Sequence, residues 1–249
     1  MNKFEQELTE FFKVWKSDKH SRYLSWGHCY HFFLDNKSKI LNEKYNNKEN
    51  DLLDIACLHL SFYLASWGMY RGSSNILWKD YKIHKNLITE LIKKCANLWK
   101  DTTWEQLEKA KNIIKDCYSE YGITATDTLI TKVLLSIFGC IPAYDNFFKE
   151  GLRLYNKEHN KNIPLTFNED SFNELKTIAK PLNLHEDFKN YPPMRLIDAY
   201  FWWTGGGKEA HEKHANIWYW SSFLVLSTSQ KCFKIKYSNK IIVLYFFFE

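Results

Sequence analysis

The apolar positions of this chain recur mostly at the spacing of α-helices. The clearest case is the N-terminal segment, in which one helical face carries Phe4, Leu8, Phe11, Phe12 and Trp15. Only nine glycines and five prolines interrupt 249 residues, which favours long helices over many short strands. We therefore expect helices over residues 3–16, 23–34, 51–70, 103–120, 127–139, 142–159, 171–181 and 192–204, with one more ending near Lys100.

Several helix starts carry recognisable capping residues. Asp51 stands where an N-cap belongs, and Thr103–Gln106 and Ser171–Glu174 have the spacing of capping boxes. Pro142 is expected at the first turn of its helix, where a missing N–H costs nothing. Residues 51–70 are apolar nearly all round, which predicts a buried central helix.

The C-terminal tail has a different pattern. Residues 233–238 alternate apolar and polar side chains, and residues 241–248 are almost continuously apolar, so the two segments fit a β-hairpin. Two alternatives stay open: a native hairpin, or an extension from a frameshifted or truncated reading frame. The sequence thus predicts an all-α, multi-helix globular bundle over residues 1–214 and an apolar tail, hairpin or extension, over residues 215–249.

The composition is that of a folded protein, and it does not identify a binding partner. Apolar residues make up 45% and aromatic residues 17%, enough for a sizeable core. The net charge of +5 is compatible with a nucleic-acid partner but does not require one. Lysine is abundant in the manner of an AT-rich genome, whereas only four residues are arginine, so each arginine is more informative than any lysine. For each arginine, a partly buried salt bridge is the alternative to a binding role.

The sequence also predicts a cytoplasmic protein. Its six cysteines are scattered and mostly lie in apolar stretches, as reduced core cysteines do. The N-terminal segment carries acidic residues from Glu5 onward and has no apolar signal segment. The longest uncharged runs, residues 55–70 and 215–230, are 16 residues each, shorter than the roughly 18–20 needed to span a bilayer. We expect no membrane partner, and the oligomeric state stays open.

Three short motifs suggest chemistry only superficially. His28 and His31, like His211 and His214, have a spacing that holds a metal only with a third ligand from elsewhere. The segment 205–208 reads Gly-Gly-Gly-Lys, but it follows an aromatic helix and precedes a glutamate, unlike a phosphate-binding loop. We interpret it as a helix C-cap and flexible turn. The sequence therefore predicts no metal site and no cofactor.

Two Arg/His pairs match a loose pattern of helical RNases. Arg22 with His28, and Arg153 with His159, resemble the Arg-x(4–6)-His motif of HEPN-type enzymes. This resemblance implies that His and Arg act on the scissile phosphate as acid/base and charge stabiliser. Neither pair has the polar residue that usually follows the arginine. The alternative reading is that these are surface helix residues.

The segment Lys132–Asp145 is the strongest pointer to catalysis. A lysine within an apolar helix is followed by a short turn and Pro142-Ala-Tyr-Asp145. Over about 30 residues this resembles the catalytic segment of helix-hairpin-helix DNA glycosylases, which implies that Lys132 is an amine nucleophile and Asp145 activates it or stabilises the sugar cation. The hairpin's second glycine is missing and both spacings differ from that family. In the alternative, non-catalytic interpretation, Asp145 caps a helix and the Lys132 side chain extends out of the core.

The turn at residues 66–73 is a second candidate, because it combines Gly68 with Arg71 beside a long uncharged run. Arg71 alternatively offsets a helix dipole. We expect a cleft in any enzyme of this sequence where five residues converge: Arg71, Tyr144 and Arg195 for binding, and Lys132 and Asp145 for catalysis.

As a whole the chain resembles a small bacterial protein family of unknown function, through its SWGMYRGS turn, IPAYDNFF turn and YPPMRLIDAYFW helix. That resemblance implies no mechanism. Two function classes remain: a helical binding or regulatory protein, favoured by the lack of strong catalytic motifs, and a nucleic-acid-processing enzyme of glycosylase-like or RNase type.

Overall fold

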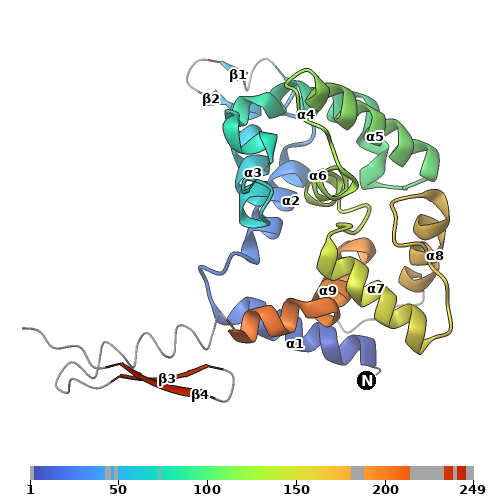
Figure 1. The fold of residues 1–249 in the computed structure, drawn as a ribbon. Helices are drawn as coiled ribbons and strands as arrows, with labels where there is room; N and C mark the ends of the chain where they lie inside the picture. The colour runs from blue at the N-terminus through green and yellow to red at the C-terminus, as the bar shows by residue number, and fades with distance from the viewer. Residues whose placement is uncertain are drawn as a thin grey trace, which may run out of the picture. The chain divides into compact units, whose positions relative to one another are not determined.

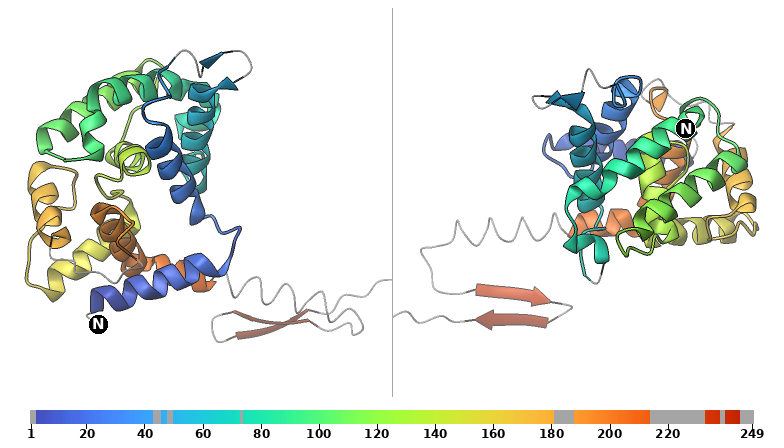
Figure 2. Two further views of the ribbon diagram at one scale, coloured as in Figure 1. Left: turned by 180° about the vertical axis from the view of Figure 1, so that it is seen from behind. Right: turned by 90° about the horizontal axis from the view of Figure 1, so that it is seen from above.

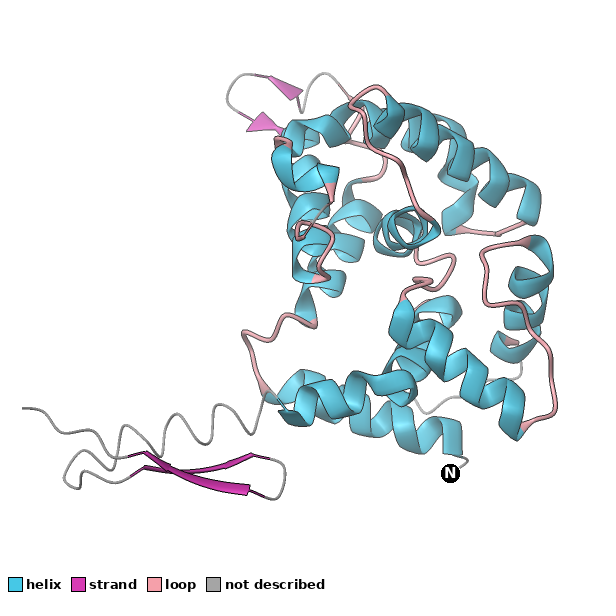
Figure 3. Ribbon diagram, viewed as in Figure 1, coloured by secondary structure: helices cyan, strands magenta, loops and turns pink. Residues whose placement is uncertain are grey.

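The computed structural model describes residues 3–42, 46–47, 50–72, 74–180, 188–213, 233–237 and 240–244. The chain forms two compact units, residues 1–206 and 207–249. The first unit is a multi-helix, all-α globular fold, as the apolar spacing predicted (Figure 3).

The helices of the first unit follow one another with short connections. They are α1 (Lys3–Ser17), α2 (Leu24–Asn36), α3 (Leu52–Ser66), α4 (His84–Cys95), α5 (Trp104–Ser119), α6 (Asp127–Phe138), α7 (Asn146–Glu158), α8 (Glu169–Ala179) and α9 (Pro193–Trp202). The 3₁₀ turns between the described helices include η2 (Asn75–Trp78), η3 (Tyr81–Ile83) and η4 (Ala96–Trp99). Two-residue strands β1 (Asn46–Asn47) and β2 (Asn50–Asp51) pair just before α3.

Two helices organise this unit. Helix α6 packs against α2, α3 and α5, and it is seen almost end-on between them in Figure 1. Helix α9 packs against α1, α7 and α8 (Figures 1 and 2). We call these sets the α6 group (α2–α6) and the α9 group (α1, α7, α8, α9). The α6–α7 connection, residues 139–145, joins the two groups.

Helices α6 and α9 are buried more completely than α3, the segment whose composition predicted a buried central helix, and residues 194–202 of α9 are all buried. Every residue from Leu129 to Phe138 is buried. Helix α3, although apolar nearly all round, exposes Ile55, Leu58 and Phe62, the last to 60%. Periodicity cannot distinguish these cases, because a wholly apolar helix gives no polar face to orient it.

The helix starts confirm some capping predictions and correct others. The Asp51 carboxylate caps α3, and Thr103 forms a capping box with Gln106 at the start of α5. Helix α7 begins at Asn146 and not at Pro142, because the Asp145 carboxylate accepts the N–H of Phe148. Helix α8 likewise begins two residues before Ser171, capped by the Asn168 side chain.

Helices α7 and α9 approach closely through glycines. A methyl group added at Gly151 would overlap the carbonyl oxygen of Phe201. One added at Gly205 would overlap the carbonyl oxygen of Phe147. The residues after α9 (Trp203–Gly207) begin as a π-helical turn, Gly205 is pressed against α7, and Gly206 leaves the helical conformation with φ +125°.

The second unit contains the antiparallel pair β3 (Phe233–Tyr237) and β4 (Lys240–Leu244), with Ile235 opposite Ile242. These strands fall where the alternation of the tail placed a hairpin. Residues 208–213 are helical, and residues 214–232 lie outside the described part of the chain, as does His214. Among the described helices, none is long and apolar enough to cross a membrane.

Candidate functional site

A cleft of about 450 Å³ opens between the α6 group and the α9 group. We call it the arginine cleft. It is lined by the end of α3 and the following turn, one face of α6, the start of α7, and single residues from elsewhere: Arg22, Ala65–Met69, Arg71, Thr128, Lys132, Asp145–Phe147 and Trp202. Two of the four arginines of the chain therefore line one cleft.

Lys132 and Asp145 form an ion pair in the wall of this cleft. The Lys132 Nζ atom lies 3.1 Å from Asp145 Oδ2 and 3.2 Å from the carbonyl oxygen of Trp67, to which it also donates. The Lys132 side chain is only 4% exposed, and that of Asp145 17%. The two residues that the resemblance made catalytic candidates are thus in contact, and their ion pair ties α6 to the α3 turn and to the start of α7.

Asp145 has two roles at once. One carboxylate oxygen accepts from Lys132, and the other caps α7 through the N–H of Phe148 at 3.0 Å. Because the first turn of α7 also lines the cleft, the positive end of a helix dipole faces the same space. The capping role foreseen as an alternative to catalysis therefore coexists with the lysine pair.

The segment before Asp145 is held from both sides. The N–H of Ala143 donates to Asp198 Oδ1 at 2.8 Å, and the N–H of Tyr144 donates to Thr131 Oγ1 at 2.9 Å. The Thr128 hydroxyl donates to the carbonyl oxygen of Tyr144 at 2.8 Å. These bonds fix a connection that has no regular structure of its own, and with it the position of Asp145.

Arg22 and Arg71 bring positive charge without a carboxylate partner. Within the described residues neither arginine forms an ion pair. The guanidinium of Arg22 lies over the Trp67 ring at 5.2 Å, and Lys132 Nζ lies 5.4 Å from the same ring. Arg71 folds back over Gly68, whose φ of +75° and missing side chain leave room for the guanidinium.

Aromatic rings form the remaining wall. The rings of Trp67 and Trp202 meet edge to face at 5.3 Å, and those of Phe147 and Trp202 at 5.6 Å. Phe147 is 36% exposed, although it is a large apolar residue. The cleft therefore offers cations on one part of its lining and ring surface on another.

Tyr144 and Arg195 do not reach this cleft, contrary to the expected convergence. The Tyr144 side chain is buried, shares a hydrogen bond with the Ser171 hydroxyl, and has a pKa raised by burial. Arg195 is 2% exposed, pairs with Asp198 on its own helix, and lies over the rings of Trp26 and Trp15. The proposed convergence thus holds for Arg71, Lys132 and Asp145 alone.

The Arg/His pairs do not form a shared site. Arg22 lines the arginine cleft, but His28 is an exposed residue of α2 and is not among its lining residues. Arg153 pairs with Glu150 on the exposed side of α7, and the His159 ring packs on Tyr155. Within the part of the chain that the structure describes, no three His, Cys, Asp or Glu side chains are grouped to hold a metal ion.

Sequence reasoning missed Arg22 as a cleft residue, because it was considered only with His28. The small number of arginines in the chain was the available signal for Arg22, because arginine is the residue best suited to bind a doubly charged anion. Comparison of the chain with family models, curated proteins and solved structures finds no match. The function must therefore be argued from the geometry of the cleft.

Proposed function

We propose that this chain is a bacterial cytoplasmic binding protein that takes up a phosphate-bearing ligand in the arginine cleft. One observation carries the proposal: Arg22 and Arg71, half of the arginines in the chain, line one cleft and have no carboxylate partner within the described residues. A guanidinium offers paired N–H donors that match two phosphate oxygens.

Local electrostatics supports the same ligand class. Lys132 and Asp145 balance each other, so the charge of the lining residues is set by the two arginines. The first turn of α7 adds a helix N-terminus, which favours an anion by its dipole. A dianion in the cleft is attracted by Arg22, by Arg71 and by the N-terminus of α7, whereas a cation is attracted by none of these three groups.

The aromatic wall favours a ligand with a planar group beside its phosphate. Phe147 presents exposed ring surface in the same lining, and flat rings stack on such surfaces. A mononucleotide, or the phosphorylated end of a nucleic acid, has both features. Adenosine 5′-monophosphate is therefore the probe that matches the lining.

Replacing Arg71 with alanine is expected to weaken binding of adenosine 5′-monophosphate at least about tenfold, because a hydrogen bond to a charged group contributes about 1.5–3 kcal/mol. Adenosine, which lacks the phosphate, should bind the wild-type protein at least about tenfold more weakly than the monophosphate does. Isothermal titration calorimetry at low ionic strength measures both differences, and added salt should weaken only the phosphate-dependent part.

Arg153→Ala is the matched control, because it removes an arginine that lies outside the cleft and pairs with Glu150. It should leave the affinity within about twofold. Equal affinity for adenosine and its monophosphate, or an equal loss in the Arg153 variant, would contradict the proposal. A 5′-phosphorylated DNA trinucleotide in a parallel titration shows whether the phosphate belongs to a free nucleotide or to a strand end.

A second candidate function is a Schiff-base lyase acting on abasic DNA, and the Lys132–Asp145 contact at the cleft favours it. In that reaction Asp145 accepts a proton from the amine, the amine attacks the aldehyde carbon of the abasic sugar, and water leaves as the imine forms. Borohydride then reduces the imine to a stable secondary amine.

Incubation with abasic DNA and borohydride should in that case give a covalent adduct that Lys132→Ala abolishes. Lys149→Ala, which changes an α7 lysine outside the cleft lining, should leave the adduct yield unchanged. No adduct with the wild-type protein excludes the lyase and leaves the binding proposal standing.

A further inference from the structure

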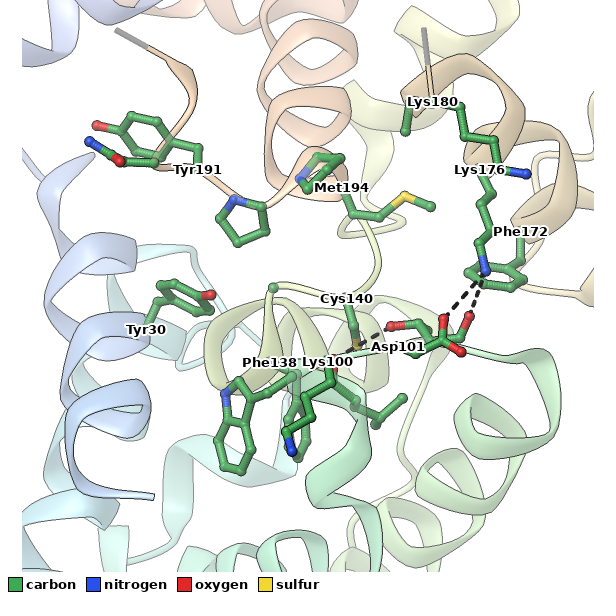
Figure 4. A pocket seen from close by; sticks show the side chains of 18 of the residues that line it. Tyr30, Lys100, Asp101, Phe138, Cys140, Phe172, Lys176, Lys180, Tyr191 and Met194 are labelled. Atoms are coloured by element: carbon green, nitrogen blue, oxygen red, sulfur yellow. Dashed lines mark hydrogen bonds and ion pairs between the residues drawn. The ribbon is translucent and has the colours of Figure 1, made fainter. Parts of the chain in front are cut away.

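A second cleft, of about 440 Å³, lies on another part of the boundary between the helix groups. We call it the lysine cleft. Its walls come from α2, from η4 and the residues after it, from the end of α6, from α8, and from the segment that leads into α9. Figure 4 shows the rings of Tyr30 and Tyr191 on one side of the cleft and Lys176 and Lys180 on the other, with Met194 between them.

The floor of the lysine cleft is apolar and buried. Phe138, Cys140, Phe172 and Met194 line it and are 1–7% exposed. Five of the lining side chains are aromatic rings: Tyr30, Trp99, Phe138, Phe172 and Tyr191. A flat apolar ligand that enters this cleft is therefore transferred from water to a surface of aromatic rings and a thioether.

The rim of the same cleft is positively charged. Among the described residues, Lys100, Lys176, Lys180 and Lys189 line it, against the single carboxylate of Asp101. Lys176 is already engaged, since its Nζ donates to the Thr102 carbonyl oxygen at 2.9 Å and lies 3.9 Å from the Asp101 carboxylate. Within the described residues Lys100 and Lys180 form no ion pair, so these two exposed ammonium groups are available to an anion.

Backbone geometry fixes the shape of this cleft. Gly139 ends α6 with φ +66°, and an added methyl group there would stand 2.7 Å from Pro192 and 3.0 Å from the Tyr30 ring. The Trp99 indole N–H donates to the Ile137 carbonyl oxygen at 2.9 Å, which holds that ring beside Phe138. The apolar walls are thus held in place by the fold itself, as preformed ligand sites usually are.

We propose that the lysine cleft binds a planar aromatic carboxylic acid, with its ring system on the aromatic floor and its carboxylate at the positively charged rim. No arginine lines this cleft, and the ammonium groups act as point charges that suit a single carboxylate. The excess of lysine over aspartate at the rim disfavours a cation of the same shape. This site shares no lining residue with the arginine cleft, so it stands independently of the function proposed above.

The probes are 2-naphthoate and its neutral analogue 2-naphthamide, titrated into the full-length protein and followed by calorimetry and ¹⁵N chemical shifts. The acid should bind at least about tenfold more tightly than the amide, because only the acid gains the attraction of the rim. In the variant Lys100→Glu/Lys180→Glu, the dissociation constant of the acid should rise at least about tenfold, and that of the amide should change less than about twofold.

Lys79→Glu/Lys115→Glu is the matched control, since it makes the same change in net charge at two exposed lysines outside both clefts. All four lysines are exposed, and far-ultraviolet circular dichroism verifies that each variant is folded. Equal affinity for acid and amide overturns the proposal, as does an equal loss in the control variant. Absence of binding at about 5 mM 2-naphthoate overturns it as well.

Discussion

Replacing Asp198 with asparagine is expected to lower the free energy of unfolding by about 3–5 kcal/mol, because it leaves the buried guanidinium of Arg195 without a counter-charge. Arg195 is 2% exposed and lies 4.9 Å over the Trp26 ring and 5.2 Å over the Trp15 ring. Its Nε and Nη2 atoms have no hydrogen-bond partner in the described structure. The ring faces attract the cation but do not replace a carboxylate.

Asparagine keeps an acceptor for the N–H of Ala143, so the variant removes charge and leaves that bond in place. Urea unfolding followed by tryptophan fluorescence measures the loss. The double variant Arg195→Met/Asp198→Asn should recover at least about half of it, since removing both charges removes the unpaired one. A single variant within about 1 kcal/mol of wild type, or a double variant as unstable as the single one, contradicts this account of the pair.

Burial also raises the pKa of the Asp198 carboxyl, against the opposing effects of Arg195 and the Ala143 N–H. The cost of removing both charges from water therefore opposes the attraction between Arg195 and Asp198. The clearest structural consequence of the pair is that it positions residues 143–145. Since Asp145 follows directly and lines the arginine cleft, the buried pair supports the cleft without facing it.

The helix predictions were most accurate where the spacing of apolar side chains agreed with the residues that begin and end a helix. Helix α6 has an apolar face, a Thr126 cap and a glycine end, and it begins and ends close to the expected residues. Helix α9 starts at Pro193, as a first-turn proline suggests. The failures arose where two signals competed. Pro142 looked like a helix start, but the carboxylate of Asp145 captured the N–H that begins α7.

The candidate site was only partly predictable, for a physical reason. A charged residue in an apolar element either faces a cleft or pairs inside the core, and the one-dimensional pattern is the same for both. Arg71 proved to be of the first kind, and Lys132 and Asp145 combine both, because they pair with each other in the wall of the cleft. Arg195 proved to be of the second kind, and its partner Asp198 was visible one helical turn later in the sequence. Arg22 was missed because only tertiary packing brings it over Trp67.

Acidification is expected to destabilise the protein through His84, which is wholly buried between two tyrosines. The Tyr70 hydroxyl lies 3.0 Å from His84 Nε2, and the Tyr118 hydroxyl lies 3.1 Å from Nδ1. Burial lowers the pKa of His84 from 6.5 to about 3, because no anion compensates for desolvation of the charged ring. The unfolded chain therefore binds a proton that the folded protein excludes, and stability falls as pH drops from about 6.5 toward about 3.

Between pH 7.5 and pH 4.5 this single group is expected to remove about 2–3 kcal/mol of unfolding free energy. The wild-type protein should accordingly lose about that much more stability over the interval than His84→Gln, which cannot titrate. Urea unfolding at the two pH values gives the difference directly. His20→Gln, a change at an exposed histidine between α1 and α2, is the control and should lose as much as wild type.

If His84→Gln lost as much unfolding free energy between pH 7.5 and pH 4.5 as wild type does, the buried imidazole would not be the cause of the acid destabilisation. Tyr70, which contacts His84, directly precedes Arg71 of the arginine cleft. Because the pKa of His84 in the folded protein is about 3, the ring stays neutral down to pH 4.5 and keeps its contacts with the two tyrosines. Over that interval, binding of adenosine 5′-monophosphate should therefore change no more in wild type than in His84→Gln.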